Sequence, residues 1–290
     1  MYICPIENSM IRAMALMIAL AASVNSGNAQ VPSGATEITV RAPDEVSGVA
    51  AIKDGFVVVG DGEPRQIFEA GSNRTRPITF GNANGNICDP ESIDVGYRPD
   101  GSTTTFVLGE DFKTVFVEGG TPISLPPEFH ERCNRGAEGL SVRWKDGGWD
   151  LLVVSEGGIP QGKHVAHRDK TLNCSRAEQQ KCPLEKAIYN PHLARYHVSA
   201  DGRQAELKQL SILHTSHLLT KIDNTQGFRA TDIAWFGDGF LVLLGSTPLK
   251  KRGGFKHTWI KGFTTDGSPM PNMTMKLETL WGAYRDGKNW

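Results

Sequence analysis

The sequence has no cluster of basic residues, and after residue 30 it has no apolar run long enough to span a bilayer. Its 31 Lys and Arg are balanced by 32 Asp and Glu, for a formal net charge of -1, and they are scattered along the chain. Because neutralising a phosphate backbone needs clustered cations, we expect no nucleic-acid partner. We also expect no membrane span once an N-terminal signal has been cleaved.

Several enzyme signatures are missing as well. There is no Gly-x-Ser-x-Gly elbow, no His-Glu-x-x-His helix and no Gly-x-Gly-x-x-Gly loop after a strand. Residues 157–163 have the spacing of a phosphate-binding loop, but His164 stands where that loop needs Ser or Thr. The sequence therefore contains no motif of the serine hydrolases, the zinc proteases or the nucleotide-binding proteins.

The N-terminus has the features of an export signal. A basic residue precedes an apolar run at residues 13–22, and Gly27 and Ala29 supply the small residues of a cleavage site. We predict a signal peptide at residues 1–29 and a periplasmic or secreted location. The alternatives are a buried N-terminal helix and a start of translation at Met10.

Cysteines are few, and their number fits an exported protein. Of the five, Cys4 lies within the predicted signal, which leaves an even number for disulfides in an oxidising compartment. Cys174 and Cys182 flank a short polar loop and form the favoured pair. Cys88 and Cys133 occupy equivalent places in two successive repeats and form the second. Three pairings are formally possible.

Four segments of the chain share one pattern. Each opens with a small or acidic pair before an apolar strand, passes through an Asp-Gly turn and ends in a second, strongly apolar strand. The openings begin at residues 47, 91, 138 and 231, in steps of 44, 47 and 93 residues. This period, with paired strands and tight turns, is typical of β-propeller blades. We predict an all-β fold, a single propeller domain of four-stranded blades over residues 36–290.

Further strands complete each expected blade. Third strands are expected at 66–69, 113–117, 194–198 and 258–261, and fourth strands near 77–80, 121–125, 206–213 and 274–280. The long third step indicates an inserted loop at residues 157–193 that projects over one end of the propeller. Residues 36–40 are expected to close the ring, and residues 286–290 look like the start of another blade. We therefore expect five or six blades, the last incomplete in this chain.

Several short motifs resemble a family of exported bacterial propellers. They are residues 45–49, 89–93, 134–140 and 229–233. These segments resemble the phytase-like family, also called "esterase-like activity of phytase", and related domains of unknown function. The resemblance extends over residues 40–265; it implies a propeller fold and points to hydrolysis of phosphoesters or esters. The 157–193 insertion and the abrupt C-terminal end depart from the family pattern.

The repeat openings place acidic residues at corresponding points around the propeller axis. They are Glu45, Glu91, Glu138 and Asp232. Converging carboxylates repel one another and need a cation, protonation or basic partners. Their oxygen atoms favour Ca²⁺ or Mg²⁺ over softer metals. Arg135 and Arg229 lie close to two openings and are candidate ligand-binding residues or partners. The alternative is that opening carboxylates accept backbone N–H groups of the next blade and tie the blades together.

Two functions follow, and the sequence leaves open whether the chain is an enzyme. The first is a metal-dependent hydrolase of phosphoesters or esters, with Ca²⁺ as the expected ion and Glu91 or Glu138 as general base. The second is a non-catalytic propeller that binds a protein, peptide or glycan. His164 and His167 of the insertion would assist the first, or would bind zinc beside the cysteines.

Overall fold

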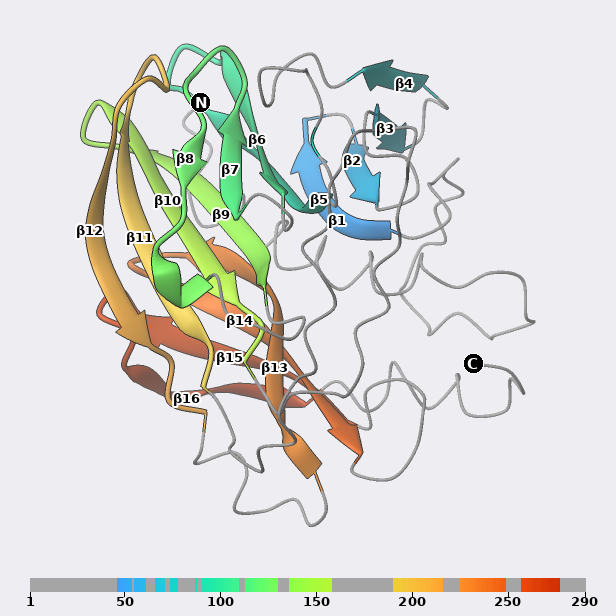
Figure 1. Ribbon diagram of the computed structural model, residues 1–290, viewed down its shortest axis with the longest axis vertical. Coiled ribbons are helices and arrows are strands. Elements are labelled where there is room, and N and C mark those ends of the chain that lie inside the picture. The colour runs from blue at the N-terminus through green and yellow to red at the C-terminus, as the bar shows by residue number, and fades with distance from the viewer. Residues whose placement is uncertain are drawn as a thin grey trace.

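The computed structural model describes residues 46–53, 55–60, 66–70, 74–77, 87, 90–109, 113–129, 136–157, 190–215, 225–248 and 257–276. These residues form four antiparallel sheets of four strands each, arranged as the blades of a β-propeller (Figure 1). The predicted all-β propeller with four-stranded blades is thus confirmed. Four blades are described, and nothing in the ranges above forms a fifth. The same residues contain no helix of the length and apolar character needed to cross a bilayer.

The blades follow one another along the chain, and within each blade the strands are hydrogen-bonded in sequence order. Blade 1 contains β1 (Val46–Ile52), β2 (Gly55–Gly60), β3 (Gln66–Ala70) and β4 (Arg74–Pro77), and blade 2 contains β5 (Pro90–Tyr97), β6 (Thr103–Gly109), β7 (Thr114–Val117) and β8 (Ile123–Ser124), followed by the 3₁₀ turn Pro127–Phe129. Blade 3 contains β9 (Ala137–Lys145), β10 (Gly148–Ser155), β11 (His192–Ser199) and β12 (Ala205–Ile212), and blade 4 contains β13 (Thr225–Phe236), β14 (Gly239–Pro248), β15 (His257–Thr264) and β16 (Pro269–Lys276).

The first strand of each blade is the innermost one. β5 packs between β1 and β9, and β9 packs against β13. The fourth strands β4, β12 and β16 lie at the periphery of the view in Figure 1. The repeat openings therefore belong to the strands that surround the axis.

Apolar cores fill the spaces between successive blades. Alternate side chains of a strand point to opposite faces of its sheet. In β10, Leu151 and Val153 join the core shared with blade 2, while Leu152 and Val154 join the core shared with blade 4. A strand buried on both faces reads as a continuous apolar run instead of an alternating one, which is why the second strand of each repeat is so apolar.

The turn between β9 and β10 has the residues that its backbone requires. Asp146 and Gly147 both have positive φ, at 52° and 76°. Two successive positive φ values define a type I′ hairpin turn, which favours Asp-Gly. In blade 4 the turn lies one residue before the predicted Asp238-Gly239, because Gly237 has φ of 56° and Gly239 already begins β14.

Some strand predictions need correction or lie outside the described residues. The four third strands were placed correctly, but β4 and β16 begin three and five residues earlier than the fourth strands predicted for blades 1 and 4. The chain turns back on itself sooner than the apolar pattern indicates. The connection from β10 to β11 carries the predicted insertion, and most of it, with the predicted signal, residues 36–40 and residues 286–290, lies outside the described ranges.

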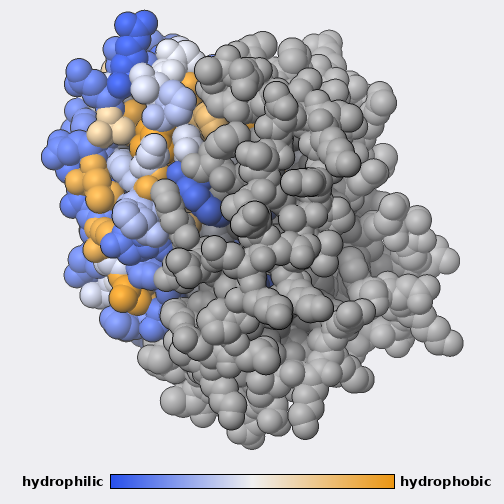
Figure 2. All heavy atoms as spheres, viewed as in Figure 1, coloured by the Kyte–Doolittle hydropathy of each residue, from blue (hydrophilic) through white to orange (hydrophobic). Residues whose placement is uncertain are grey.

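The described part of the surface is largely hydrophilic, with scattered apolar groups (Figure 2). The exposed large apolar side chains among these residues are Leu207, Leu210 and Ile212 on β12 and Met275 on β16. Single exposed apolar side chains are ordinary on soluble proteins.

Candidate functional site at the propeller axis

A narrow cavity of about 20 Å³ lies between the four innermost strands. Most of the residues that line it are Ala, Val, Ile and Leu of β1, β5, β9 and β13. The polar residues of the wall are Asp94, Ser141 and Asp232. This volume holds about one water molecule. The cavity can therefore accept a water or a single ion, and an organic substrate has to bind outside it.

Asp94 is a buried residue of this wall and accepts hydrogen bonds from both sides. Its Oδ1 accepts the N–H of Val95 at 2.8 Å. Its Oδ2 accepts the N–H of Val142 at 2.7 Å and the hydroxyl of Ser141 at 3.2 Å, both from blade 3. The carboxylate thus links the innermost strands of blades 2 and 3.

Asp232 brings a second carboxyl to the same cavity. The residue keeps some exposure to the cavity, but its carboxyl lies deep among protein atoms, and its Oδ1 accepts the N–H of Ile233 at 2.8 Å. This burial raises the pKa of Asp232 well above its usual value, the hydrogen bond from Ile233 opposes the rise, and the charge of Asp94 adds to it. The two carboxyls are close enough to repel each other.

Hydroxyl groups make equivalent links at neighbouring positions. Ser141 occupies in blade 3 the repeat position that Asp94 occupies in blade 2, and its Oγ accepts the N–H of Trp235 in blade 4 at 3.1 Å. The Oγ of Ser92 accepts the N–H of Leu140 at 3.2 Å. Ser92, Asp94 and Ser141 therefore link neighbouring blades, a role that the sequence raised as an alternative for the opening carboxylates and not for these three residues.

Each repeat opening contains a β-bulge at the same position. The hairpin register skips one residue of the innermost strand in every blade, and these residues are Ser47, Glu91, Glu138 and Thr231. A bulge leaves the extra residue outside the ladder and re-aims its side chain. The repeated sequence pattern at the openings thus encodes a repeated backbone irregularity at one end of the axis.

The predicted acidic set is brought together only in part. Asp232 lies in the cavity wall, whereas Glu91 and Glu138 are half-buried bulge residues that are not part of it. Glu45 lies outside the described residues. Asp94 was not among the predicted ligands, although its place three residues after Glu91 follows directly from the repeat alignment.

Arg229, predicted to bind a ligand, forms an ion pair with Glu156 of blade 3. The backbones of the same region are also joined, because the N–H of Ala230 donates to the carbonyl of Glu156 at 2.8 Å. Both charged side chains are largely buried. The pair fastens blade 4 to blade 3 at the end of the axis where the innermost strands begin. Arg135 lies outside the described residues.

The remaining predicted groups lie where the structure gives no description. Cys88, Cys133, Cys174 and Cys182 fall outside the described ranges, so both disulfides stay predictions, and the same holds for the two histidines of the insertion.

The cavity offers oxygen donors that suit a small hard cation, but few of them. Two carboxylates and a hydroxyl are oxygen donors of the kind that Ca²⁺ and Mg²⁺ prefer. Within the part of the chain that is described, no three His, Cys, Asp or Glu side chains gather closely enough to hold a metal ion. A cation between Asp94 and Asp232 would therefore need water or other groups to complete its coordination.

Comparison of the sequence with protein-family models gives no match, and comparison with curated proteins gives none either.

Proposed function

We propose that this propeller is a cation-dependent hydrolase of phosphoesters or esters, with Asp94 and Asp232 as the residues that hold the cation. The observation that carries the proposal is the pair of carboxyls in one small cavity, where the charge of Asp94 adds to the rise in the pKa of Asp232. A divalent ion would neutralise this repulsion. When bound, such an ion supplies a Lewis acid and an acidified water.

The substrate is proposed to bind at the end of the cavity where the innermost strands begin. The cavity itself is too small for an organic molecule. Glu91 and Glu138 lie at that end. Each precedes the wall residues of its own strand by two or three residues, and each is the bulge residue that stands outside the sheet ladder. In this proposal one of the two glutamates removes the proton from the attacking water.

The resemblance to phytase-like propellers supports the choice of phosphoesters and esters. The predicted signal at residues 1–29 adds a periplasmic or secreted location, where the four later cysteines would be paired. Ca²⁺ is the proposed ion because its coordination geometry is flexible and its oxygen ligands can include waters beside the carboxylates.

A second function is favoured by a different observation. Ser92, Asp94 and Ser141 are already engaged in links between blades. If these links are the whole role of the polar residues near the axis, the protein is a non-catalytic propeller that binds a protein, peptide or glycan on its end face.

A further blade is part of the proposal. The faces of blades 1 and 4 that point away from the described neighbours are apolar and buried, as Val58, Phe68, Leu243 and Ile260 show. We infer five or six blades in the complete ring, because sheets in a propeller cover these faces with a neighbouring blade. An experimental structure in which β13 packs directly on β1 would contradict this.

Hydrolysis assays on the full chain test the enzyme proposal. We expect p-nitrophenyl phosphate or p-nitrophenyl acetate to be hydrolysed with Ca²⁺ and not with a chelator. Glu91→Gln or Glu138→Gln should lower kcat by about 10²–10⁴-fold, the usual contribution of a general base. The matched control is Asp201→Asn, an exposed carboxylate of blade 3. A wild-type protein that binds Ca²⁺ but hydrolyses neither ester favours the second function.

A further inference from the structure

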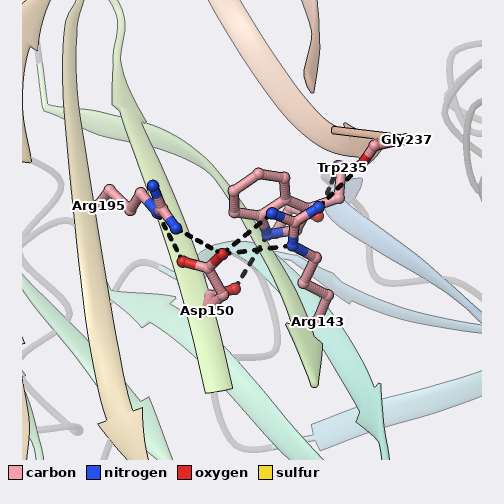
Figure 3. A network of polar contacts seen from close by, with 6 residues as sticks. Arg143, Asp150, Arg195, Trp235 and Gly237 are labelled. Atoms are coloured by element: carbon pink, nitrogen blue, oxygen red, sulfur yellow. Dashed lines mark hydrogen bonds and ion pairs between the residues drawn. The ribbon is translucent and has the colours of Figure 1, made fainter. Parts of the chain in front are cut away.

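Away from the axis, one buried carboxylate is held by two arginines. Asp150 of β10 lies in the face of blade 3 that turns toward blade 4, and its side chain is 4% exposed. Arg195 of β11 donates from Nε to Oδ1 at 2.7 Å and from Nη2 to Oδ2 at 3.0 Å. Arg143 of β9 donates from Nε and Nη2 to Oδ2 at 3.3 and 3.1 Å. Figure 3 shows the carboxylate between the two guanidinium groups.

Arg143 also contacts blade 4. Its Nη1 donates to the carbonyl of Gly237 at 2.7 Å, and its guanidinium carbon lies 3.5 Å from the ring centre of Trp235. The indole N–H of Trp235 in turn donates to the carbonyl of Asp150 at 2.9 Å. Arg143 and Trp235 therefore stitch blade 3 to blade 4 (Figure 3).

The interface between blades 2 and 3 contains a comparable contact between an arginine and tryptophan rings. Between blades 2 and 3, Arg98 lies over the rings of Trp144 and Trp149 and donates to the carbonyl of Ala200 at 2.6 Å. That stitch uses one arginine and no buried carboxylate. A contact of this kind between two blades therefore does not require a second arginine such as Arg195.

Among the described residues, Asp150 is the one acidic side chain that forms ion pairs with Arg143 and Arg195, so two guanidinium groups share a single negative charge there. Of the ten N–H groups on the two arginines, three from Arg143 and two from Arg195 have partners among the described residues. The side chains of Arg143 and Arg195 are 19% and 24% exposed, so both are partly open to solvent.

We propose that Arg143 and Arg195 form a binding site for a small oxyanion, either a phosphate group or a carboxylate, between blades 3 and 4. Both guanidinium groups are held by the same carboxylate and keep N–H groups without a partner among the described residues, and guanidinium donors pair well with the oxygen atoms of phosphate and carboxylate groups. The stacking on Trp235 holds Arg143 in place, so little conformational entropy is lost when the anion binds. The site is separate from the axial carboxyls and does not depend on the proposed hydrolase function.

Titration of the full chain with inorganic phosphate and with acetate, at constant ionic strength set by chloride, tests the site and separates its two possible ligands. Two-dimensional NMR should show saturable shifts at the indole N–H of Trp235 with the preferred anion. Arg195→Gln, which keeps Asp150 paired with Arg143, should weaken that binding by about tenfold or more. The matched control is Arg203→Gln, an exposed arginine of the same blade.

Anion binding by Asp150→Asn distinguishes a binding site from a purely structural network, in which this change would not strengthen anion binding. Removing the carboxylate leaves two arginines to attract the anion, so we expect the variant to bind it about tenfold more tightly than wild type. Adding the anion should also raise the melting temperature of the variant by more than it raises that of wild type. The proposal is overturned if wild type shows no saturable binding of either anion, or if Arg195→Gln binds as well as wild type. If Asp150→Asn does not fold, Arg195→Gln decides alone.

Discussion

The backbone N–H of Val142 donates a 2.7 Å hydrogen bond to Oδ2 of Asp94, and this bond joins the innermost strands of two neighbouring blades. In the next interface, the N–H of Trp235 makes the equivalent bond to the hydroxyl of Ser141. Blades 1 and 4 have alanines, Ala50 and Ala234, at the same repeat position. The axial polar groups are therefore concentrated where blades 2, 3 and 4 meet.

Asp94→Ala should destabilise the fold strongly. The change removes the acceptor of the Val95 and Val142 N–H groups, and both donors remain buried. We expect a loss of about 2–4 kcal/mol in the free energy of unfolding, measured by urea denaturation. Asp94→Asn keeps one acceptor oxygen and should lose less. Equal losses for the two variants would argue against the hydrogen-bonding role.

The stability of the protein should fall as the pH rises because of Asp232. Burial raises the pKa of this carboxyl in the folded state above the value of 3.8 that we take for the unfolded chain, so the folded state holds its proton more tightly. The stabilising contribution is complete below pH 3.8 and is lost as the pH rises through the folded-state pKa. Asp232→Asn has no such proton to lose.

Unfolding free energies of wild type and Asp232→Asn across this pH range measure the effect. The difference between the two proteins should shift in favour of the variant as the pH rises, and then level off. The asparagine retains an oxygen that accepts the N–H of Ile233, which limits other effects of the change. Parallel pH profiles for the two proteins would show that Asp232 does not titrate as described.

Gly139→Ala should force the innermost strands of blades 3 and 4 apart. A β-carbon at residue 139 would lie 2.7 Å from Cα of Asp232, a distance that backbone atoms cannot accommodate without moving. We expect a cost of about 1–3 kcal/mol, as for overpacked cores, and weaker cation binding at the displaced Asp232. Gly237→Ala is the matched control for adding a methyl group, since a β-carbon there meets open space, although its positive φ adds local strain.

Trp149→Ala should be far more costly than Trp144→Ala, although both residues flank the same hairpin. Trp149 is fully buried and packs edge-to-face against Phe106 at 5.7 Å and Trp144 at 4.8 Å between ring centres. Truncation of such a core residue costs about 3–5 kcal/mol. Trp144 is only partly buried against the same core. Similar melting temperatures for the two variants would contradict the packing described.

The propeller architecture could be predicted because the same pattern of strand, tight turn and apolar strand recurs in each repeat. The second strand of every blade carries an apolar run, and the turn at Asp146 and Gly147 has the residues that its positive φ values demand. The outer strands were harder to place because burial does not constrain their pattern. β16, for example, begins five residues earlier than predicted, and most of its residues are exposed, so its sequence mixes Met273 and Met275 with polar neighbours.

The candidate site was predicted less well, for a backbone reason. Glu91 and Glu138 are the most conspicuous acidic residues of the openings, but a bulge falls at both, and hydropathy patterns give no sign of a bulge. The cavity is instead shared by Asp94 and Asp232, which stand at different repeat positions. The cavity spans two or three successive residues of each innermost strand, so it includes both positions although equivalent positions pack against each other, as Gly139 does against Asp232.

Calorimetric titration of the full chain with Ca²⁺ at neutral pH, beside Asp232→Asn, tests the axial site most directly. We expect wild type to bind one ion saturably and the variant to lose at least about tenfold in affinity, because one of two carboxylates is removed. Asp201→Asn should bind as wild type does. Undetectable binding by a folded wild-type protein, or equal affinity in Asp232→Asn, would contradict the axial cation site and leave the binding of a partner as the function to pursue.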